Sequence, residues 1–338
     1  PGSDKPDEVM VHGVSPGGFS MNYNPALKAA YKLCDNVLAI SGFGGHSSAD
    51  LRKLLAGHNV KSLLKIGNTS EEVTVLSSKA DLETALQLLY LKTTAITRDD
   101  NAYDALIASE RGKLSRPVQT ATNAMGDTIH SIVYRRHPLG AKLRAADLDS
   151  MDYDKVINLH RERFGDMGDF TFIVTGDFDT DSIRPLLETY LASLPSTGRR
   201  ERARDIGYGF FSGHGSFDYT HPMTDYPQSI TYSFFNGECP YDLEHILRAQ
   251  AFGQILKSRL LADIREARGL TYGITTHCSV TAGFNGPDTP SRFILPVYIK
   301  VAPGHEAECY EAVRSTVKAL CEEGPTAEEL AKVTAYLS

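Results

Sequence analysis

The sequence predicts an α+β fold of two similar domains, each a mainly antiparallel sheet with helices packed on one face. The main observation is a unit that occurs three times, in which an apolar strand is followed by a polar turn and an amphipathic helix. Hairpin-like strand runs lie between these units, and this combination is typical of a sheet covered by helices on one side. The length of 338 residues also suits about two domains, each with its own core.

The first domain is expected over residues 1–198. Its earliest helix is marked by Asn24 and Pro25, because asparagine caps helix N-termini and proline suits the first helical position. A glycine turn and a short helix follow over residues 42–57. Two strand–helix units complete the domain, EEVTVLSSKADLETALQLLYLKTT at 71–94 and FTFIVTGDFDTDSIRPLLETYLASLP at 170–195.

Residues 199–216 are expected to form an inter-domain linker. This part of the chain is rich in glycine, serine and arginine and lacks clear periodicity. Its arginines are expected to be solvated, with an anion-binding patch as the alternative. They are Arg199, Arg200, Arg202 and Arg204.

The second domain is expected over residues 217–338. It begins with a strand at 228–237 and a long helix at 241–269. The third strand–helix unit follows at 292–320, and its helix is expected to bury four side chains, those of Tyr310, Val313, Val317 and Leu320. The final residues, AEELAKVTAYLS, read as a helix that is cut short, so we expect this chain to be a fragment of a longer protein.

The composition argues against nucleic-acid and membrane partners. The net charge is −7 and the pI is about 5.9, whereas anionic surfaces favour basic proteins. No apolar run approaches the roughly 20 residues of a transmembrane helix, so no such segment is expected. The cysteines form no C-x-x-C pair and are expected to be thiols without chemistry; they are Cys34, Cys239, Cys278, Cys309 and Cys321.

Motifs for a metal or a nucleophile are missing from the sequence. It contains neither H-E-x-x-H nor the inverted H-x-x-E-H, and no G-x-S-x-G. Two near misses are His305 with Cys309 in HEAEC, and YDLEH, where Tyr241 stands in place of a first histidine. Both are expected to be packing or surface residues of helices. The GFGG run at 42–45 is too short for a phosphate loop and is expected to be a turn.

The stretch LLADIREARGLTYGIT, residues 260–275, predicts a helix that stops at Gly269 and a strand that begins near Tyr272. Arg265 and Tyr272 lie on either side of that stop. One interpretation is that Arg265 favours the negative end of the helix dipole while Tyr272 packs at the strand. The other is that both side chains donate to one carbonyl oxygen, on which amide hydrolysis builds negative charge. Such donors need a separate agent to activate water, which this chain does not offer.

At these residues the chain resembles the insulinase/pitrilysin family of inverzincin zinc peptidases. SRLLADIREARGLTYGI at 258–274 is similar to that family's R-x6-Y segment, and the unit at 170–195 has its pattern of an apolar strand, Gly-Asp, a helix and Leu-Pro. YRRHPLG at 134–140 and the segment at 143–165 resemble the part that precedes this unit. The N-terminal part is similar to the third domain of the long, four-domain bacterial members, so the resemblance covers nearly the whole chain.

The resemblance implies an enzyme of two halves, each with two similar α+β domains. The first half carries H-x-x-E-H, whose histidines bind zinc and whose glutamate activates water, together with a distal glutamate ligand. The second half closes over it like a clamshell around an unfolded peptide. It supplies an arginine and a tyrosine that bind the substrate carbonyl, and by position these are Arg265 and Tyr272.

The chain departs from the pattern of a first half. The helix at 24–41, which would carry H-x-x-E-H there, contains no histidine and no glutamate. The resemblance therefore implies the metal-free C-terminal half of a zinc metalloendopeptidase, which is inactive alone and has no metal or cofactor of its own. Zinc would lie in the complementary half. The implied partners are a zinc-bearing N-terminal half or partner subunit and a peptide substrate.

The alternative is a non-catalytic scaffold or partner subunit of the same fold, similar to the core proteins of respiratory complexes. Arg265 and Tyr272 argue against a scaffold. The residues themselves indicate neither the compartment nor whether both halves share one polypeptide. The resemblance alone favours the bacterial cell envelope or periplasm.

Overall fold

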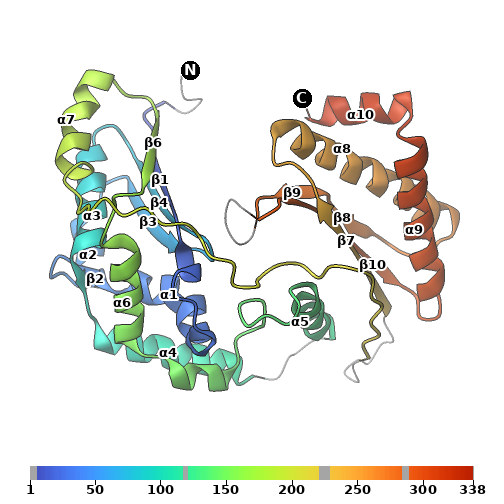
Figure 1. Cartoon of the computed structure of the whole chain (residues 1–338), viewed down its shortest axis with the longest axis horizontal. Helices are drawn as coiled ribbons and strands as arrows, with labels where there is room; N and C mark the ends of the chain where they lie inside the picture. The colour runs from blue at the N-terminus through green and yellow to red at the C-terminus, as the bar shows by residue number, and fades with distance from the viewer. Residues whose placement is uncertain (1–5, 117–120, 221–228, 284–288, 338) are drawn as a thin grey trace. The chain divides into compact units, whose positions relative to one another are not determined.

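The computed structural model describes residues 6–116, 121–220, 229–283 and 289–337 (Figure 1). The chain divides into two compact units. The first comprises Pro1–Pro117 and His137–Tyr208, and the second comprises Val118–Arg136 and Gly209–Ser338. Every strand pair in the described residues is antiparallel, and helices accompany the sheet of each unit. The predicted α+β class is confirmed.

The first unit is built on a four-stranded sheet of order β3-β4-β1-β6. The strands are β1 (Val9–Pro16), β3 (Val60–Ile66), β4 (Ser70–Ser77) and β6 (Thr171–Gly176). Side chains alternate between the faces of a strand, and on β1 Val9 and Val11 are buried while Val14 is exposed. Valines at alternate positions of β4 are buried in the same way. The buried face is the one that the helices of this unit cover (Figure 1).

The helices of the first unit follow the expected order. Asn24 caps the helical segment that begins at Pro25 by accepting a hydrogen bond from the Ala26 amide. Leu86 and Leu89 of the predicted helix after β4 are fully buried. The helical elements are η1 (Gly18–Ser20), η2 (Pro25–Leu27), α1 (Lys28–Ile40), α2 (Ser48–Leu54), α3 (Leu82–Thr94), α4 (Asp100–Leu114), η3 (Ala145–Ser150), α6 (Tyr153–Phe164) and α7 (Thr180–Tyr190), and a small sheet joins β2 (Gly42–Phe43) to β5 (Ile96–Thr97).

The second unit has a sheet of order β7-β10-β8, with β9 also paired to β10. Its elements are α5 (Ala121–Val133), β7 (Ser229–Glu238), α8 (Leu243–Leu260), the π-helix η4 (Leu261–Ala267), β8 (Ile274–Thr276), β9 (Ser279–Thr281), β10 (Arg292–Val301), α9 (Glu306–Glu323) and α10 (Ala327–Leu337). The core joins α8 to β10 through residues such as Leu256, Leu260, Leu295 and Ile299.

The helix α9 corrects one expectation. Val313 and Leu320 are buried and Val317 packs against the core as predicted, but Tyr310 is exposed. The core-facing stripe of the helix also includes Cys309, one position earlier, and this leaves Tyr310 at the edge of the stripe.

Helix α5 packs with the second unit although the sequence on both sides of it belongs to the first. The Phe211 amide donates to the Val133 carbonyl oxygen at 2.6 Å. The Phe210 ring lies 5.2 Å from that of Tyr134 and 5.3 Å from that of Phe234 on β7. The expected domain boundaries, 1–198 and 217–338, assign α5 to the first domain. In the structure this helix belongs to the second unit instead.

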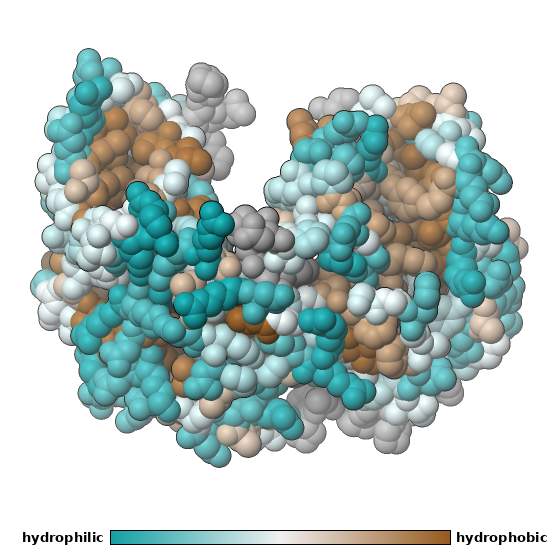
Figure 2. Space-filling view, viewed as in Figure 1, coloured by the Kyte–Doolittle hydropathy of each residue, from teal (hydrophilic) through white to brown (hydrophobic). Residues whose placement is uncertain are grey.

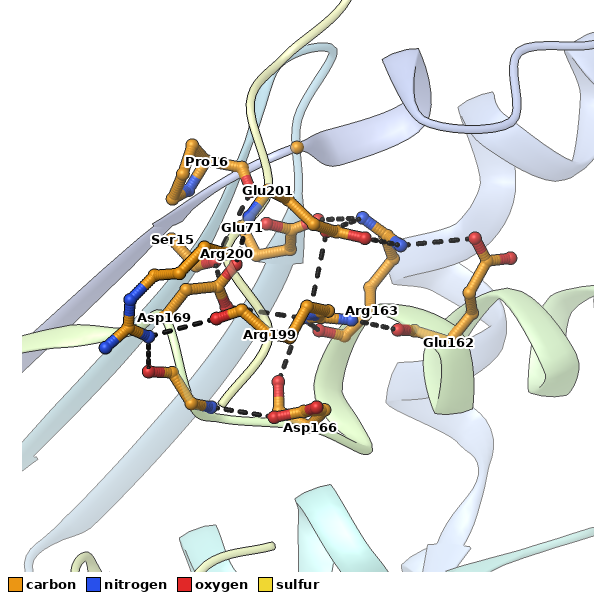
Figure 3. A network of polar contacts seen from close by, with 12 residues as sticks. Ser15, Pro16, Glu71, Glu162, Arg163, Asp166, Asp169, Arg199, Arg200 and Glu201 are labelled. Atoms are coloured by element: carbon orange, nitrogen blue, oxygen red, sulfur yellow. Dashed lines mark hydrogen bonds and ion pairs between the residues drawn. The ribbon is translucent and has the colours of Figure 1, made fainter. Parts of the chain in front are cut away.

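The start of the expected linker is bound to the first unit (Figure 3). The Arg199 guanidinium donates to the carbonyl oxygens of Glu162 and Asp166, each at 2.9 Å, and so satisfies acceptors at the end of α6. The prediction of solvated arginines is therefore wrong for Arg199. It holds for Arg202 and Arg204, which are exposed.

The same segment closes a buried ionic network (Figure 3). Arg163 of α6 donates to both carboxylate oxygens of Glu201, at 2.8 and 3.2 Å, and to Glu71 of β4 at 3.1 Å. Only 2% of Arg163 and none of Glu71 is exposed. Glu71 also accepts from the Gly18 amide at 2.7 Å. The network thus ties β4, α6 and the segment after α7 together.

His160 is expected to make the first unit sensitive to acid. It is buried on α6, and burial lowers its pKa to about 4, whereas an unfolded histidine titrates near 6.5. Its contribution to stability is therefore complete above pH 6.5 and is lost as the pH falls toward 4, at up to about 1.4 kcal/mol per pH unit. Urea unfolding at pH 7 and pH 4.5 measures this. His160→Gln should lose clearly less stability over that range, and equal losses would refute the assignment.

No helix among the described residues is both long and apolar enough to cross a membrane. On the face drawn in Figure 2, hydrophilic residues surround separate apolar patches in each unit.

Candidate functional site

The helix–strand junction of the second unit, residues 261–274, has an unusual backbone. Helix α8 runs directly into the π-helix η4, in which the Arg268 amide donates to the Asp263 carbonyl oxygen at 3.1 Å, five residues back. Short π-helical turns are rare and occur frequently at functional sites. Gly269 then adopts φ +66°, a left-handed conformation that suits glycine at a helix end. The predicted helix stop at Gly269 is confirmed.

Arg265 projects from this π-helix without a partner in the described parts of the chain. It is exposed, while the preceding Ile264 is fully buried and anchors the turn in the core. Arg268, three residues later, has side-chain partners, unlike Arg265. It donates to both Asp263 oxygens at 2.8 and 3.0 Å and to Glu308 of α9 at 3.1 Å. Arg268 therefore braces the junction, and Arg265 is left available for a ligand.

Tyr272 is 99% exposed, so the interpretation that it packs at the strand start is wrong. Its hydroxyl makes no hydrogen bond within the described residues. The residues around it are held firmly, because Thr271 is buried and bonded to β10 and Ile274 is buried and paired with Ile299. The phenol is thus presented to solvent by a turn whose two sides are anchored.

The junction combines two hydrogen-bond donors of different character. Arg265 offers the N–H donors of a guanidinium and Tyr272 offers the O–H donor of a phenol. Arg265 and Tyr272 share the junction, and no hydrogen bond joins their side chains among the described residues. Both can donate to an oxygen that gains negative charge during a reaction. That role remains a prediction.

A metal site does not form in the described part of this chain, where no three of the His, Cys, Asp and Glu side chains gather suitably. The two near misses have structural explanations. Cys309 is buried in the core beside α8. His245 lies 2.8 Å from the Asp242 carboxylate, which caps α8.

Burial disfavours a nucleophilic role for three of the cysteines. All five are free thiols, and burial raises the pKa of Cys278 to about 11. The thiolate is the reactive form of cysteine, so Cys278 is unreactive at neutral pH. Burial raises the pKa of Cys34 and Cys309 as well.

Residues 150–337 match the sequence model of the peptidase M16 inactive domain. The chain belongs to this family. The match includes the whole junction with Arg265 and Tyr272, and it confirms the resemblance to the insulinase/pitrilysin zinc peptidases and the assignment to an inactive half.

Known M16 proteins resemble this inactive domain in sequence and fold. The probable zinc protease PqqL of Escherichia coli (strain K12) is 21% identical over 277 residues, which are 81% of this chain and 29% of PqqL. The crystal structure of the periplasmic protease PqqL from Escherichia coli has a TM-score of 0.85 at 17% identity, over 99% of this chain and 36% of that one. The M16 inactive domain from Pseudomonas fluorescens has a TM-score of 0.71 at 16% identity, over 100% of this chain and 79% of that one.

The comparisons also show how much of its relatives this chain covers. It spans about a third of the length of PqqL, with 29% of that sequence and 36% of the crystallised chain covered. At such low sequence identity, the structural likeness shows the fold.

Proposed function

We propose that this chain is the substrate-binding, metal-free half of a zinc metalloendopeptidase, and that Arg265 and Tyr272 bind the carbonyl of the peptide bond to be cleaved. The observation that carries the proposal is the presentation of two unpartnered donors on one anchored junction of the described chain, with Tyr272 99% exposed. Burial or internal pairing of these side chains would have indicated a structural role. Membership of the M16 inactive-domain family gives the junction a peptidase context.

The two halves would divide the chemistry between them. Zinc held by the complementary half would supply the activated water. Tyr272 would donate its phenolic proton in a hydrogen bond to the carbonyl oxygen, and Arg265 would offer a fixed positive charge to the same oxygen. Both interactions strengthen as negative charge develops on that oxygen, so they lower the barrier more than they tighten substrate binding.

The proposed compartment and partners follow the relatives. Escherichia coli PqqL is a periplasmic protease, and we place this chain in the same compartment. Its partner is a zinc-bearing N-terminal half, either on the same polypeptide or as a separate subunit. Its substrate is a peptide in an extended conformation.

Peptide hydrolysis by this chain alone, by the zinc-bearing half alone and by the complete protein tests the proposal. We expect turnover only from the complete protein, and we expect a zinc chelator to abolish it. Added zinc should give the isolated chain no activity. Chelator-sensitive hydrolysis by the isolated chain would contradict the division of labour. A complete, zinc-loaded protein that cleaves no peptide would favour the scaffold alternative.

A further inference from the structure

We propose that Thr271 is a positioning residue, which fixes the Tyr272 phenol for catalysis through a hydrogen bond to strand β10. The inference rests on the proposed function of Tyr272. It starts from the exposure of Tyr272, which is 99%. A ring with so little contact is not held by its own packing, so its position must be set by the backbone on either side.

Thr271 supplies that restraint. It is buried, and its hydroxyl oxygen lies 2.6 Å from the Lys300 carbonyl oxygen on β10. The Gly273 amide donates to the same hydroxyl at 3.2 Å. A threonine hydroxyl has one proton to donate and two lone pairs to accept. Two carbonyl oxygens are within reach of that proton, that of Lys300 at 2.6 Å and that of Gly273 at 3.0 Å, and the shorter distance favours the bond to β10. The hydroxyl thus closes the turn that contains Tyr272 and ties this turn to the sheet.

The other restraints on this turn act at a distance from the phenol. The next residue fixed by the sheet is Ile274, which pairs with Ile299. On the opposite side, Arg268 braces the π-helix through Asp263 and Glu308. Only Thr271 is adjacent to Tyr272 among these anchors. Loss of its hydroxyl is therefore expected to widen the range of positions of the phenol while the fold stays intact.

Catalytic groups lose efficiency when they are displaced by about an ångström. We therefore expect Thr271→Val in the complete, zinc-loaded protein to lower kcat/KM about 10-fold, mainly through kcat. Thr271→Ser keeps the hydroxyl and should restore most of this loss. Thr276→Val is the matched control, because the Thr276 hydroxyl also donates to a β10 carbonyl, that of Pro296, at 2.8 Å. Like Thr271→Val, it removes a hydroxyl bond to β10, and it should change kcat/KM less than about 2-fold.

A double-mutant cycle with Tyr272→Phe separates positioning from a general loss of stability. If Thr271 acts through the phenol, Thr271→Val should add little once the phenolic hydroxyl is gone. Full additivity of the two substitutions, or equal effects of Thr271→Val and Thr276→Val on kcat/KM, would overturn the inference. An unchanged kcat/KM in Tyr272→Phe alone would instead overturn the proposed function, so the two failures are distinguishable.

Discussion

Tyr272→Phe in the complete, zinc-loaded protein is expected to lower kcat/KM about 10²-fold, the scale on which the loss of one oxyanion donor is felt. The substitution removes a single hydroxyl from a side chain that is 99% exposed, so folding and stability should not change. KM should change little, because the hydrogen bond is strongest in the transition state. Steady-state hydrolysis of a fluorogenic peptide measures both constants. The matched control is Tyr241→Phe, which alters another exposed tyrosine of the second unit.

Arg265→Ala should have an effect of similar size on kcat/KM, for the same reason. Its matched control is Arg314→Ala, which removes an exposed arginine from α9. Arg268→Ala provides a contrast, because it breaks the ion pairs with Asp263 and Glu308 and should lower stability as well as activity. Near-normal turnover in both Tyr272→Phe and Arg265→Ala would remove the basis of the proposed function.

Arg163→Met is expected to be the most destabilising of the substitutions considered, by about 3–5 kcal/mol. Arg163 and Glu71 are both buried, and the second carboxylate oxygen of Glu71 makes no hydrogen bond with the described residues. Burial already raises the pKa of Glu71, and the charge of Arg163 opposes that shift. Without the guanidinium, an uncompensated carboxylate stays buried and the two hydrogen bonds from Arg163 to Glu201 are lost. Urea unfolding of the chain at pH 7 measures the change.

The pH dependence of Arg163→Met provides a check on this explanation. In the variant, the pKa of folded Glu71 should rise further above its unfolded value of about 4.3. Glu71 then favours the folded state only when protonated, so the deficit in unfolding free energy should be largest at neutral pH and should shrink as the pH falls. Arg248→Met breaks an exposed pair with Glu244 and should cost no more than about 0.5 kcal/mol. Equal losses in the two variants would rule out the buried network as the cause.

The strand–helix units were predictable because their side chains follow the period of the element that they form. Leu86 and Leu89 are buried as the helical spacing indicates. The placement of α5 was not predictable in this way, because the contacts of Val133 with Phe211 and of the adjoining Tyr134 with Phe210 join residues far apart in the sequence. Periodicity identifies an apolar face, but it does not say which sheet covers that face.

Local sequence patterns also do not reveal the partners of polar side chains. Arg199 stands in a stretch with the composition of a linker, yet it satisfies carbonyl oxygens at the end of α6. Its partners lie more than thirty residues away in the sequence, so only the fold reveals them. The position of Arg265 and Tyr272 on one helix–strand junction could be predicted from the sequence. The threonine hydroxyl that joins Thr271 to Lys300 could not, because it depends on the register of β10.

The affinity of the complete, zinc-loaded protein for a phosphinic peptide tests the central claim most directly. The tetrahedral phosphinate carries its negative charge where the oxyanion would form, so it reports transition-state contacts without turnover. We expect the Kd of this peptide to rise about 10²-fold in Tyr272→Phe and in Arg265→Ala, in step with the loss of kcat/KM, while the KM of the matching substrate changes little. A Kd that stays at the wild-type value in both variants would contradict the claim that Arg265 and Tyr272 stabilise the oxyanion.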